Sequence, residues 1–132
     1  MTFGAARRRW VNEQTVLEEL ERLSDESMDR VREYADAAQA SATAEADHKR
    51  LRARRILEAQ ANGVKAISAA EVHADADDEV ASAYLLRLTS AAHTDAVREA
   101  LRSIRENQNA LRTAAASARD GVTGPGFGGG PR

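Results

Sequence analysis

The sequence predicts an all-α protein in which a short N-terminal helix precedes a long antiparallel helical hairpin of coiled-coil type. Alanine supplies about a fifth of the 132 residues, and aromatic residues only 4%. This composition favours long helices, because alanine loses no side-chain entropy on becoming helical, and it offers little apolar area for a globular core. No proline or glycine interrupts residues 25–61, and a seven-residue repeat of mainly apolar side chains begins at residue 76. Two long helices joined by a short connection are expected to fold back on each other.

We expect one helical domain over residues 12–119, preceded by a flexible basic arm of residues 1–11. Asn12 can cap a first helix over residues 12–23, because its side chain accepts a bond from a free backbone N–H of the first turn. The polar cluster SDES at residues 24–27 then indicates a break and a new helix start. Acidic side chains in that first turn suit the positive end of the helix dipole.

The second helix is predicted over residues 25–61. Asn62 and Gly63 are expected to end it, because glycine adopts a positive φ without a steric penalty. Its apolar face is made mainly of small side chains, which permit close helix packing but bury little area each. This predicted face consists of Met28, Val31, Ala35, Ala38, Ala42, Ala46, Ala53 and Leu57.

The third helix is predicted over residues 69–119, and its start at residues 68–71 has the Ser-x-x-Glu pattern of a capping box. Apolar side chains recur along it at seven-residue intervals, with a second set four residues behind, as in a coiled-coil seam. One chain of this composition has little core, so we expect the seam to bind a second copy and make a homo-oligomer. The predicted oligomer seam consists of Val97, Leu101, Ile104 and Leu111.

Residues 120–132 are rich in glycine and proline and predict a disordered tail. Phe127 is its one large apolar side chain, either a docking point for a partner or an unused linker aromatic.

The absence of cysteine excludes disulfides and cysteine nucleophiles and fits a reducing compartment. No apolar run approaches the ~20 residues that span a bilayer, and the N-terminus lacks a secretory apolar segment. We therefore expect a cytoplasmic protein.

Five basic side chains crowd into residues 49–55, and the sequence leaves their role open. They form either a surface for nucleic acid or one half of an internal charge zipper, with plain solvated charge as a third reading. The hairpin favours the zipper, because a reversal near Lys65 brings the acidic run of residues 75–79 opposite. Arg55 is then expected to face Asp75, and Arg52 to face Asp78. The cluster consists of Lys49, Arg50, Arg52, Arg54 and Arg55.

A second basic set lies on the third predicted helix, where residues 96–119 carry five basic and two acidic side chains. Its members recur at intervals of four, three and seven residues, which places them on one helix face. Such a row suits phosphate contacts along a nucleic-acid strand. The alternative is an ordinary solvated face, in which Glu99 and Glu106 pair with Arg102. The set consists of Arg98, Arg102, Arg105 and Arg112.

Nothing in the sequence supports catalysis, and we expect neither an enzyme nor a cofactor. Glu45 and His48 have the Glu-x-x-His spacing of di-iron helical bundles, but those sites need two copies of the motif and further glutamates on the facing helices, and the chain has no second copy. His73 and His93 stand apart from any nucleophile or metal-ligand set. No glycine-rich phosphate loop is present, so we expect no metal or nucleotide site.

The order of these features resembles a family of small helical proteins that phages and prophages encode among their recombination genes. More distantly, it is similar to the recombination mediators of T-even phages, UvsY. The resemblance covers roughly residues 15–117 and lies in the acidic LEELERL helix, the basic helix, the glycine break, the Tyr-Leu-Leu patch at residues 84–86 and the final arginine-bearing seam. It implies an oligomer that binds single-stranded DNA and helps a recombinase displace a single-strand-binding protein. The positions that it implies for DNA contact are Lys49, Arg50, Arg52, Arg54, Arg55, Arg102 and Arg105.

The sequence thus supports two main functional hypotheses. The first is a non-enzymatic, oligomeric phage-type protein that binds single-stranded DNA and assists recombination. The second is a helical protein–protein adaptor or assembly factor, such as a phage scaffold, chaperone or inhibitor, that does not bind nucleic acid. A third class, the secreted actinobacterial helical-hairpin effectors, has a Trp-x-Gly turn, whereas residues 62–64 read Asn-Gly-Val here.

Overall fold

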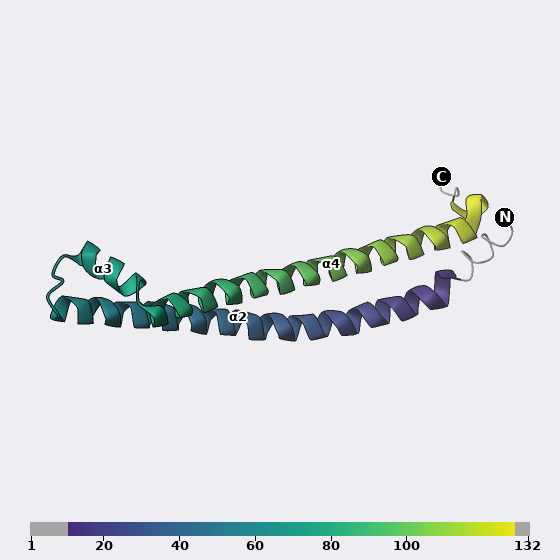
Figure 1. The fold of residues 1–132 in the computed structure, drawn as a ribbon. Coiled ribbons are helices and arrows are strands. Elements are labelled where there is room, and N and C mark those ends of the chain that lie inside the picture. The colour runs from purple at the N-terminus through teal and green to yellow at the C-terminus, as the bar shows by residue number, and fades with distance from the viewer. Residues whose placement is uncertain (1–10, 129–132) are drawn as a thin grey trace. The chain divides into compact units, whose positions relative to one another are not determined.

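The computed structural model describes residues 11–128, and these residues are helical with no strand. A short π-helical turn, η1 (Val11–Thr15), leads into α2 (Val16–Ala61), which is followed by the short α3 (Ile67–Asp75) and the long α4 (Asp78–Gly128) (Figure 1). The described residues form two compact units. We call Arg32–Arg98 the turn unit, and residues 11–31 with 99–128 the terminal unit. The all-α class and the long helices predicted from the sequence are confirmed.

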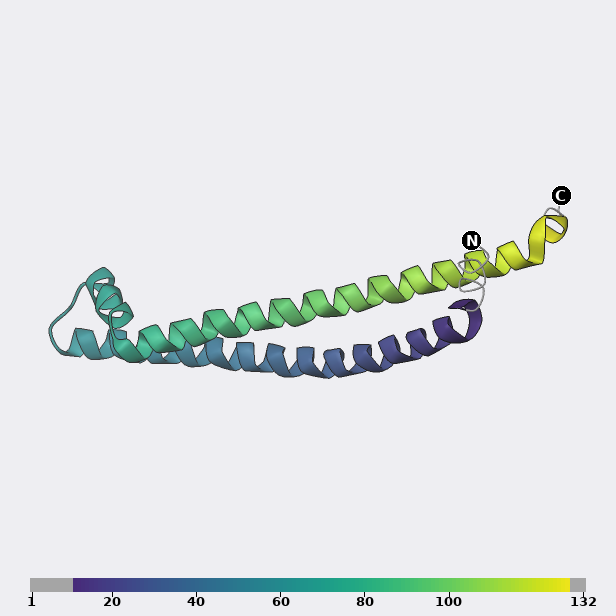
Figure 2. The same cartoon turned by 45° about the vertical axis from the view of Figure 1, so that its right-hand side comes forward.

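The turn unit contains the antiparallel hairpin. Thr94 of α4 donates a hydrogen bond from Oγ1 to the carbonyl oxygen of Ala37 in α2 at 3.1 Å. Farther toward the turn, Arg87 Nη2 lies 3.2 Å from Glu45 Oε1. Residue numbers fall along α2 as they rise along α4, so the two helices run in opposite directions. The α3 helix lies beside the C-terminal end of α2 in both views of the ribbon (Figures 1 and 2).

The predicted break at residues 24–27 is wrong, because α2 passes through them without interruption. Serine and acidic residues are acceptable in a helix, and here a local ion-pair set spans the stretch. Arg22 pairs with Glu19 on one side and with Glu26 on the other, with 3.1 Å between Arg22 Nη1 and Glu26 Oε2. Pairs at these spacings stabilise a helix. A short N-terminal helix exists as η1, and it ends at Thr15 instead of residue 23.

The predicted stop of this helix at Gly63 is confirmed. Gly63 has a φ of 109°, and it is the one residue with a positive φ among those described. The Val64 N–H bonds the carbonyl of Ala59 at 2.9 Å, and the Gly63 N–H bonds that of Gln60 at 3.2 Å. These two bonds form a Schellman motif, which satisfies the last carbonyl groups of the helix.

The third predicted helix is divided into α3 and α4 at Ala76 and Asp77. The predicted capping box is wrong, because α3 begins at Ile67 with Ala66 as its N-cap and no side-chain cap. The side-chain cap lies instead at Asp77, whose Oδ2 accepts bonds from two backbone N–H groups at the start of α4, each at 3.1 Å. Aspartate is among the strongest N-cap residues, so the acidic run starts a helix here.

The α4 helix is also longer than predicted, since it continues to Gly128 instead of ending at residue 119. It passes through the first glycine and proline residues of the expected tail. The disordered tail over residues 120–132 stays a prediction, and residues 129–132 and the basic arm up to residue 10 lie outside the described part of the chain. No helix in the described residues is long and apolar enough to cross a membrane.

The predicted heptad seam of α4 is the buried face of the helix within a single chain. In the turn unit Val80, Thr94 and Val97 are buried, and in the terminal unit Leu101 and Ile104 are buried. Three of the four side chains of the predicted oligomer seam are therefore already covered by their own chain. The fourth, Leu111, is half-buried.

The predicted apolar face of α2 is wrong, because most of its members are exposed, including Met28, Val31 and Leu57. Alanine occurs on both sides of α2, so hydrophobicity gives little contrast between its faces. The buried face of α2 also includes a polar position, His48, which a search for apolar residues passes over. The buried residues of α2 are Val16, Leu23, Ala37, Ala44, His48 and Ala59.

Replacing a large buried seam residue should destabilise the fold, and an exposed leucine of the same helix is the matched control. We expect Leu101→Ala to lower the free energy of unfolding by about 2–5 kcal/mol, because it deletes buried methyl groups and leaves a cavity. We expect Leu86→Ala, at an exposed position, to change it by less than about 0.5 kcal/mol. Urea unfolding followed by circular dichroism measures both. Equal losses in the two variants would show that the seam is not the core.

Candidate functional surfaces

The basic cluster of α2 is joined to the acidic residues of α3 and α4 by ion pairs in the turn unit. Arg52 Nε lies 2.8 Å from Asp75 Oδ1, and the same guanidinium lies 3.8 Å from Glu71. Arg55 lies 3.4 Å from Asp77 Oδ2 and 2.7 Å from Glu79 Oε2. The charge zipper is thus confirmed, although its register differs from the predicted one. The difference follows from the break before α4, which moves the acidic residues relative to a continuous helix. We call Arg52, Arg55, Glu71, Asp75, Asp77 and Glu79 the charge zipper.

The rest of the basic cluster lies outside the zipper. Lys49 Nζ pairs with Glu45 at 3.0 Å, one turn earlier on the same helix. Arg50 pairs with Asp47 at 3.4 Å. Arg54 is exposed and makes no ion pair with any residue that the structure describes. Four of the five predicted DNA-contacting side chains in this cluster are therefore already next to carboxylates.

The zipper lowers the pKa of its two aspartates. Arg52 donates a hydrogen bond to Asp75, and this bond is the main cause that holds the pKa of Asp75 below its ordinary value. For Asp77 the main cause is the bond from the backbone N–H of Val80, and the charge of Arg55 adds to it. Each interaction favours the ionised carboxylate. The zipper is therefore fully formed when both aspartates are charged.

A second polar cluster lies between α2 and α4, around the buried side chain of His48. Arg87 lies 3.2 Å from His48 Nδ1 and also reaches Glu45. Because arginine only donates, Nδ1 is the acceptor and the neutral ring carries its proton on Nε2. Tyr84 lies on the other side, with 5.2 Å between the two ring centroids. The Glu-x-x-His pair is thus engaged by an arginine, and no group of three or more metal-ligating side chains occurs in the described residues.

Arg87 is a charged side chain at a position of the heptad seam, seven residues after Val80. Its aliphatic part occupies a seam position while its guanidinium reaches polar partners on α2. Next to this cluster is a cavity of about 470 Å³. It is lined by His48, Arg52, Asp75, Val80, Ala81 and Tyr84. The sequence suggested Glu45 and His48 as a metal pair, and the signal for their real partner was Arg87, a charged residue at a heptad position of the seam.

The second basic set is divided between the two units. Arg98, in the turn unit, pairs with Asp95 at 3.1 Å and lies over the ring of Tyr34, with 5.7 Å to its centroid. Arg102, in the terminal unit, pairs with Glu99 at 3.5 Å. The two remaining members have no carboxylate partner among the described residues: Arg105 is exposed, and Arg112 bonds only the Asn109 amide at 3.4 Å.

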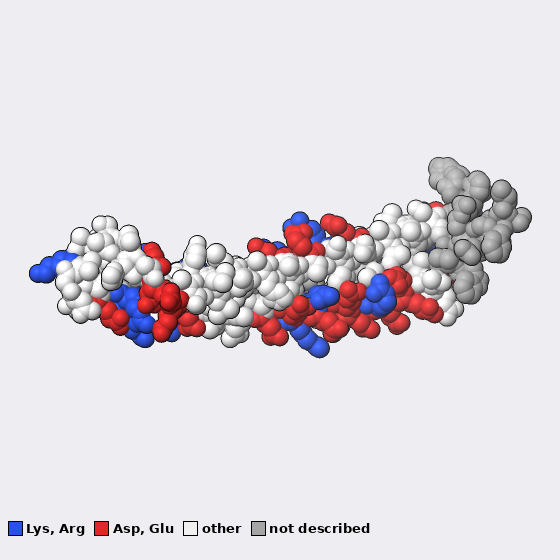
Figure 3. Space-filling view, in the orientation of Figure 1, with Lys and Arg blue, Asp and Glu red and all other residues white. Residues whose placement is uncertain are grey.

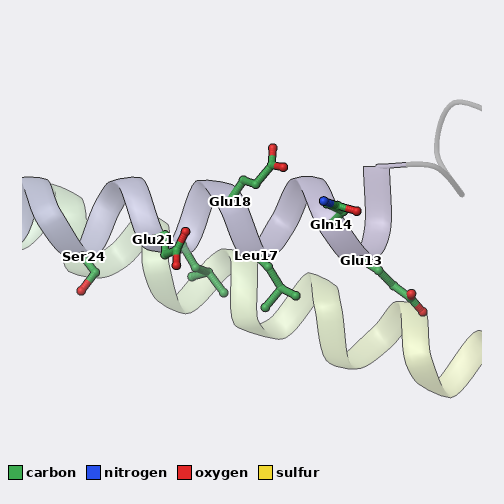
Figure 4. A pocket seen from close by; sticks show the side chains of 7 residues that line it. Glu13, Gln14, Leu17, Glu18, Glu21 and Ser24 are labelled. Carbon is green, nitrogen blue, oxygen red and sulfur yellow. The ribbon is translucent and has the colours of Figure 1, made fainter.

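The α2 portion of the terminal unit is strongly acidic, since residues 13–30 carry seven acidic and two basic side chains. A shallow depression of about 640 Å³ lies along its first turns (Figure 4). Three carboxylates, those of Glu13, Glu18 and Glu21, line it together with Leu17. A negative surface of this kind repels phosphate groups. It is not a site for a nucleic-acid backbone.

Exposed apolar side chains concentrate at the turn end of the protein. Of the ten exposed large hydrophobic residues in the part of the chain that the structure describes, seven fall between Leu57 and Leu88. The face shown in Figure 3 is mostly uncharged over α3, while acidic and basic side chains gather below it. Sequence reasoning noted the Tyr-Leu-Leu patch but did not place it on the surface. The seven are Leu57, Ile67, Val72, Tyr84, Leu85, Leu86 and Leu88.

The charge zipper should make the stability of the turn unit depend on pH in the acidic range. The folded-state pKa of Asp75 is lowered, so its contribution is present above the ordinary aspartate pKa of about 3.9 and is lost as the pH falls through the folded value. We expect the urea midpoint to fall between pH 5 and pH 2.5, and to fall less in Asp75→Asn than in the parent protein. Asp36→Asn, an exposed aspartate of α2 outside the zipper, is the control. An identical pH dependence in all three proteins would contradict the zipper.

The described residues thus offer three candidate surfaces: the zipper, the two arginines without a carboxylate partner on α4, and the apolar surface near the turn. The zipper joins α2 to α3 and to the start of α4, and the other two surfaces are open to a partner. No family model, curated protein or solved structure matches the chain.

Proposed function

We propose that this chain is a non-enzymatic helical adaptor or assembly factor, which binds another protein through apolar side chains at the turn end of its hairpin. We call Leu57, Ile67 and Val72 the tip surface. The absence of cysteine from the chain supports placing the protein in the cytoplasm. The observation that carries the proposal is the concentration of exposed large apolar residues in the turn unit.

The tip surface has the chemistry of a binding site. Its three side chains are more than half exposed, and Val72 is the most exposed at 71%. Covering a large aliphatic side chain contributes about 1.5–3 kcal/mol, so three of them supply a useful part of a binding energy. The structure keeps these residues out of its own seam, although the protein has few large apolar residues to spare. A contiguous apolar patch made by these three side chains would mark a protein-binding surface.

The distribution of charge favours a protein partner over a nucleic acid. The turn unit carries nine basic and eleven acidic side chains, so its net charge is negative. Most of its basic cluster is already next to carboxylates, as Arg52 is to Asp75. Nucleic-acid affinity depends on releasing the counterions of phosphates, which needs unneutralised cations. Apolar contact with a protein has no such requirement.

A second candidate is the oligomeric, phage-type protein that binds single-stranded DNA and assists a recombinase. The observation that favours it is the exposure of Arg54, Arg105 and Arg112 without a carboxylate partner. Arg105 and Arg112 lie two turns apart on α4, about 10 Å along its axis, so the two side chains can contact separate phosphates of one strand. The acidic α2 portion of the same unit opposes it.

Site-specific photo-crosslinking tests the tip surface in cells of the native host. A photoreactive phenylalanine derivative replaces Leu57, Ile67 or Val72 in turn, and Gln39, exposed on α2 in the same unit, is the control position. We expect one adduct of the same mass from the tip positions, because they contact one partner, and none from Gln39. Mass spectrometry identifies the adduct. Labelling of equal strength at Gln39, or no adduct at the tip, would contradict the proposal.

DNA binding separates the two candidates. We expect no change in the fluorescence anisotropy of a labelled single-stranded oligonucleotide at 50 mM salt. If the second candidate holds, binding appears and log K falls with log salt by about 0.7 for each phosphate contact. It is then weakened by Arg105→Glu and Arg112→Glu, whatever the base sequence, because phosphate contacts carry no base information. Arg22→Glu, which removes an arginine held between two glutamates, is the matched control.

A further inference from the structure

One apolar row on α4 lies on the side away from the seam and is left exposed by the residues that the structure describes, although its first member, Ala81, also borders the cavity next to His48. It consists of Ala81, Leu85, Leu88 and Ala92, which we call the outer stripe, and all four side chains are exposed. The two leucines are 61% and 49% exposed. The row belongs to the turn unit and contains no tip residue, so it is a surface separate from the one proposed above.

The outer stripe lies on the back of the seam. At 3.6 residues per turn, its centre is roughly 150° around the helix from the buried positions of the same segment, which include Val80 and Thr94. A partner that covers the stripe therefore meets α4 on the side opposite α2. The hairpin does not need to open. The segment of α4 between Val80 and Thr94 thus has two apolar faces, of which only one is used within the chain.

The spacing of the stripe is symmetric. Its members follow one another at intervals of four, three and four residues, in the order Ala, Leu, Leu, Ala. Reversing the helix direction leaves this pattern unchanged. A closed two-fold interface uses the same patch on both copies and so must be complementary to itself. A patch that reads the same in both directions along a helix meets this condition for two antiparallel helices.

We propose that the outer stripe pairs with the same stripe of a second copy, so that two α4 helices pack antiparallel in a symmetric dimer. In this arrangement Leu85 lies opposite the partner's Leu88, and Ala81 lies opposite the partner's Ala92. The four layers have leucine at the centre and alanine at both ends. Intervals of three and four residues are those of a coiled-coil core.

The charges along α4 fit this pairing. From residue 80 to residue 94 the one charged side chain is Arg87, and it is directed to the seam, where it reaches Glu45 and His48. The centre of the interface is therefore free of charge.

The size of the patch sets the strength of the dimer. Each copy contributes a core of four residues, whereas a standard interface has about 20–30 residues on each side. We therefore expect a weak dimer, with a dissociation constant in roughly the micromolar range. The side chains of the predicted oligomer seam are buried within their own chain and contribute little to it. The outer stripe takes over the role that the sequence assigned to them.

Sedimentation equilibrium of the full chain from 1 to 200 µM tests the association. We expect a monomer–dimer equilibrium in the parent protein and at least a tenfold higher dissociation constant in the double variant Leu85→Glu, Leu88→Glu. Leu86→Glu places the same charge at an exposed position of α4 outside the stripe and should leave the constant within twofold. Circular dichroism checks that all three proteins keep their helix content. A monomer across the whole range, or equal weakening by Leu86→Glu, would overturn the proposal.

Disulfide trapping tests the direction of the helices, and the parent chain contains no cysteine that interferes. In the antiparallel dimer Ala81→Cys lies beside the partner's Ala92→Cys, whereas two copies of Ala81→Cys are about 16 Å apart along the axis. We expect a mixture of the two variants to cross-link under mild oxidation, and each variant alone to stay uncrosslinked. Cross-linking of Ala81→Cys with itself would show a parallel dimer and overturn the arrangement. The tip crosslinking is independent of both results.

Discussion

The hairpin depends on a seam of small side chains. In the turn unit the buried apolar residues are alanines and two valines, Val80 and Val97. Small side chains allow two helix backbones to approach closely, but each contributes little burial, so apolar contact alone specifies the register weakly. Polar contacts across the seam supply what the alanines cannot. The bond from Thr94 to the Ala37 carbonyl and the contact of Arg87 with His48 each hold one position of α4 against one position of α2.

This constraint determines which charges the protein can offer to a partner. A register fixed by polar groups needs the charge zipper near the turn, where α3 and the start of α4 meet the basic end of α2. Arginines used in that way, such as Arg55 between Asp77 and Glu79, are no longer available as a positive surface. The exposed leucines of the turn unit, in contrast to these arginines, are not used within the chain. Because the seam takes only small side chains in the turn unit, leucines such as Leu85 remain on the outside, where a partner can reach them.

The features that could be predicted from the sequence are those that depend on a few neighbouring residues or on a regular repeat of apolar residues. Gly63 was recognisable because a helix end needs a positive φ, and the seam of α4 was recognisable because large residues such as Leu101 alternate with polar ones. The buried face of α2 was not, since alanine lies on both of its faces and His48 stands at a core position. The helix start at Asp77 was not predicted, because this aspartate belongs to an acidic run that also suits one side of a charge zipper. Asp77 has both roles, since it caps α4 and pairs with Arg55. Exposure of leucines could not be predicted, because it follows from which of two apolar faces of α4 packs on α2.

The turn at Gly63 has a consequence for chirality. A Cβ atom placed on Gly63 would meet no other atom within 4 Å, so the site excludes L-residues by backbone preference alone and not by lack of space. A D-residue has the mirror-image preference and adopts a φ near 109° without strain. D-Alanine, introduced by chemical ligation, matches this φ and restricts the unfolded chain more than glycine does. The backbone at this position thus favours a D-residue over an L-residue, and glycine occupies it because glycine is the one genetically encoded amino acid that is achiral.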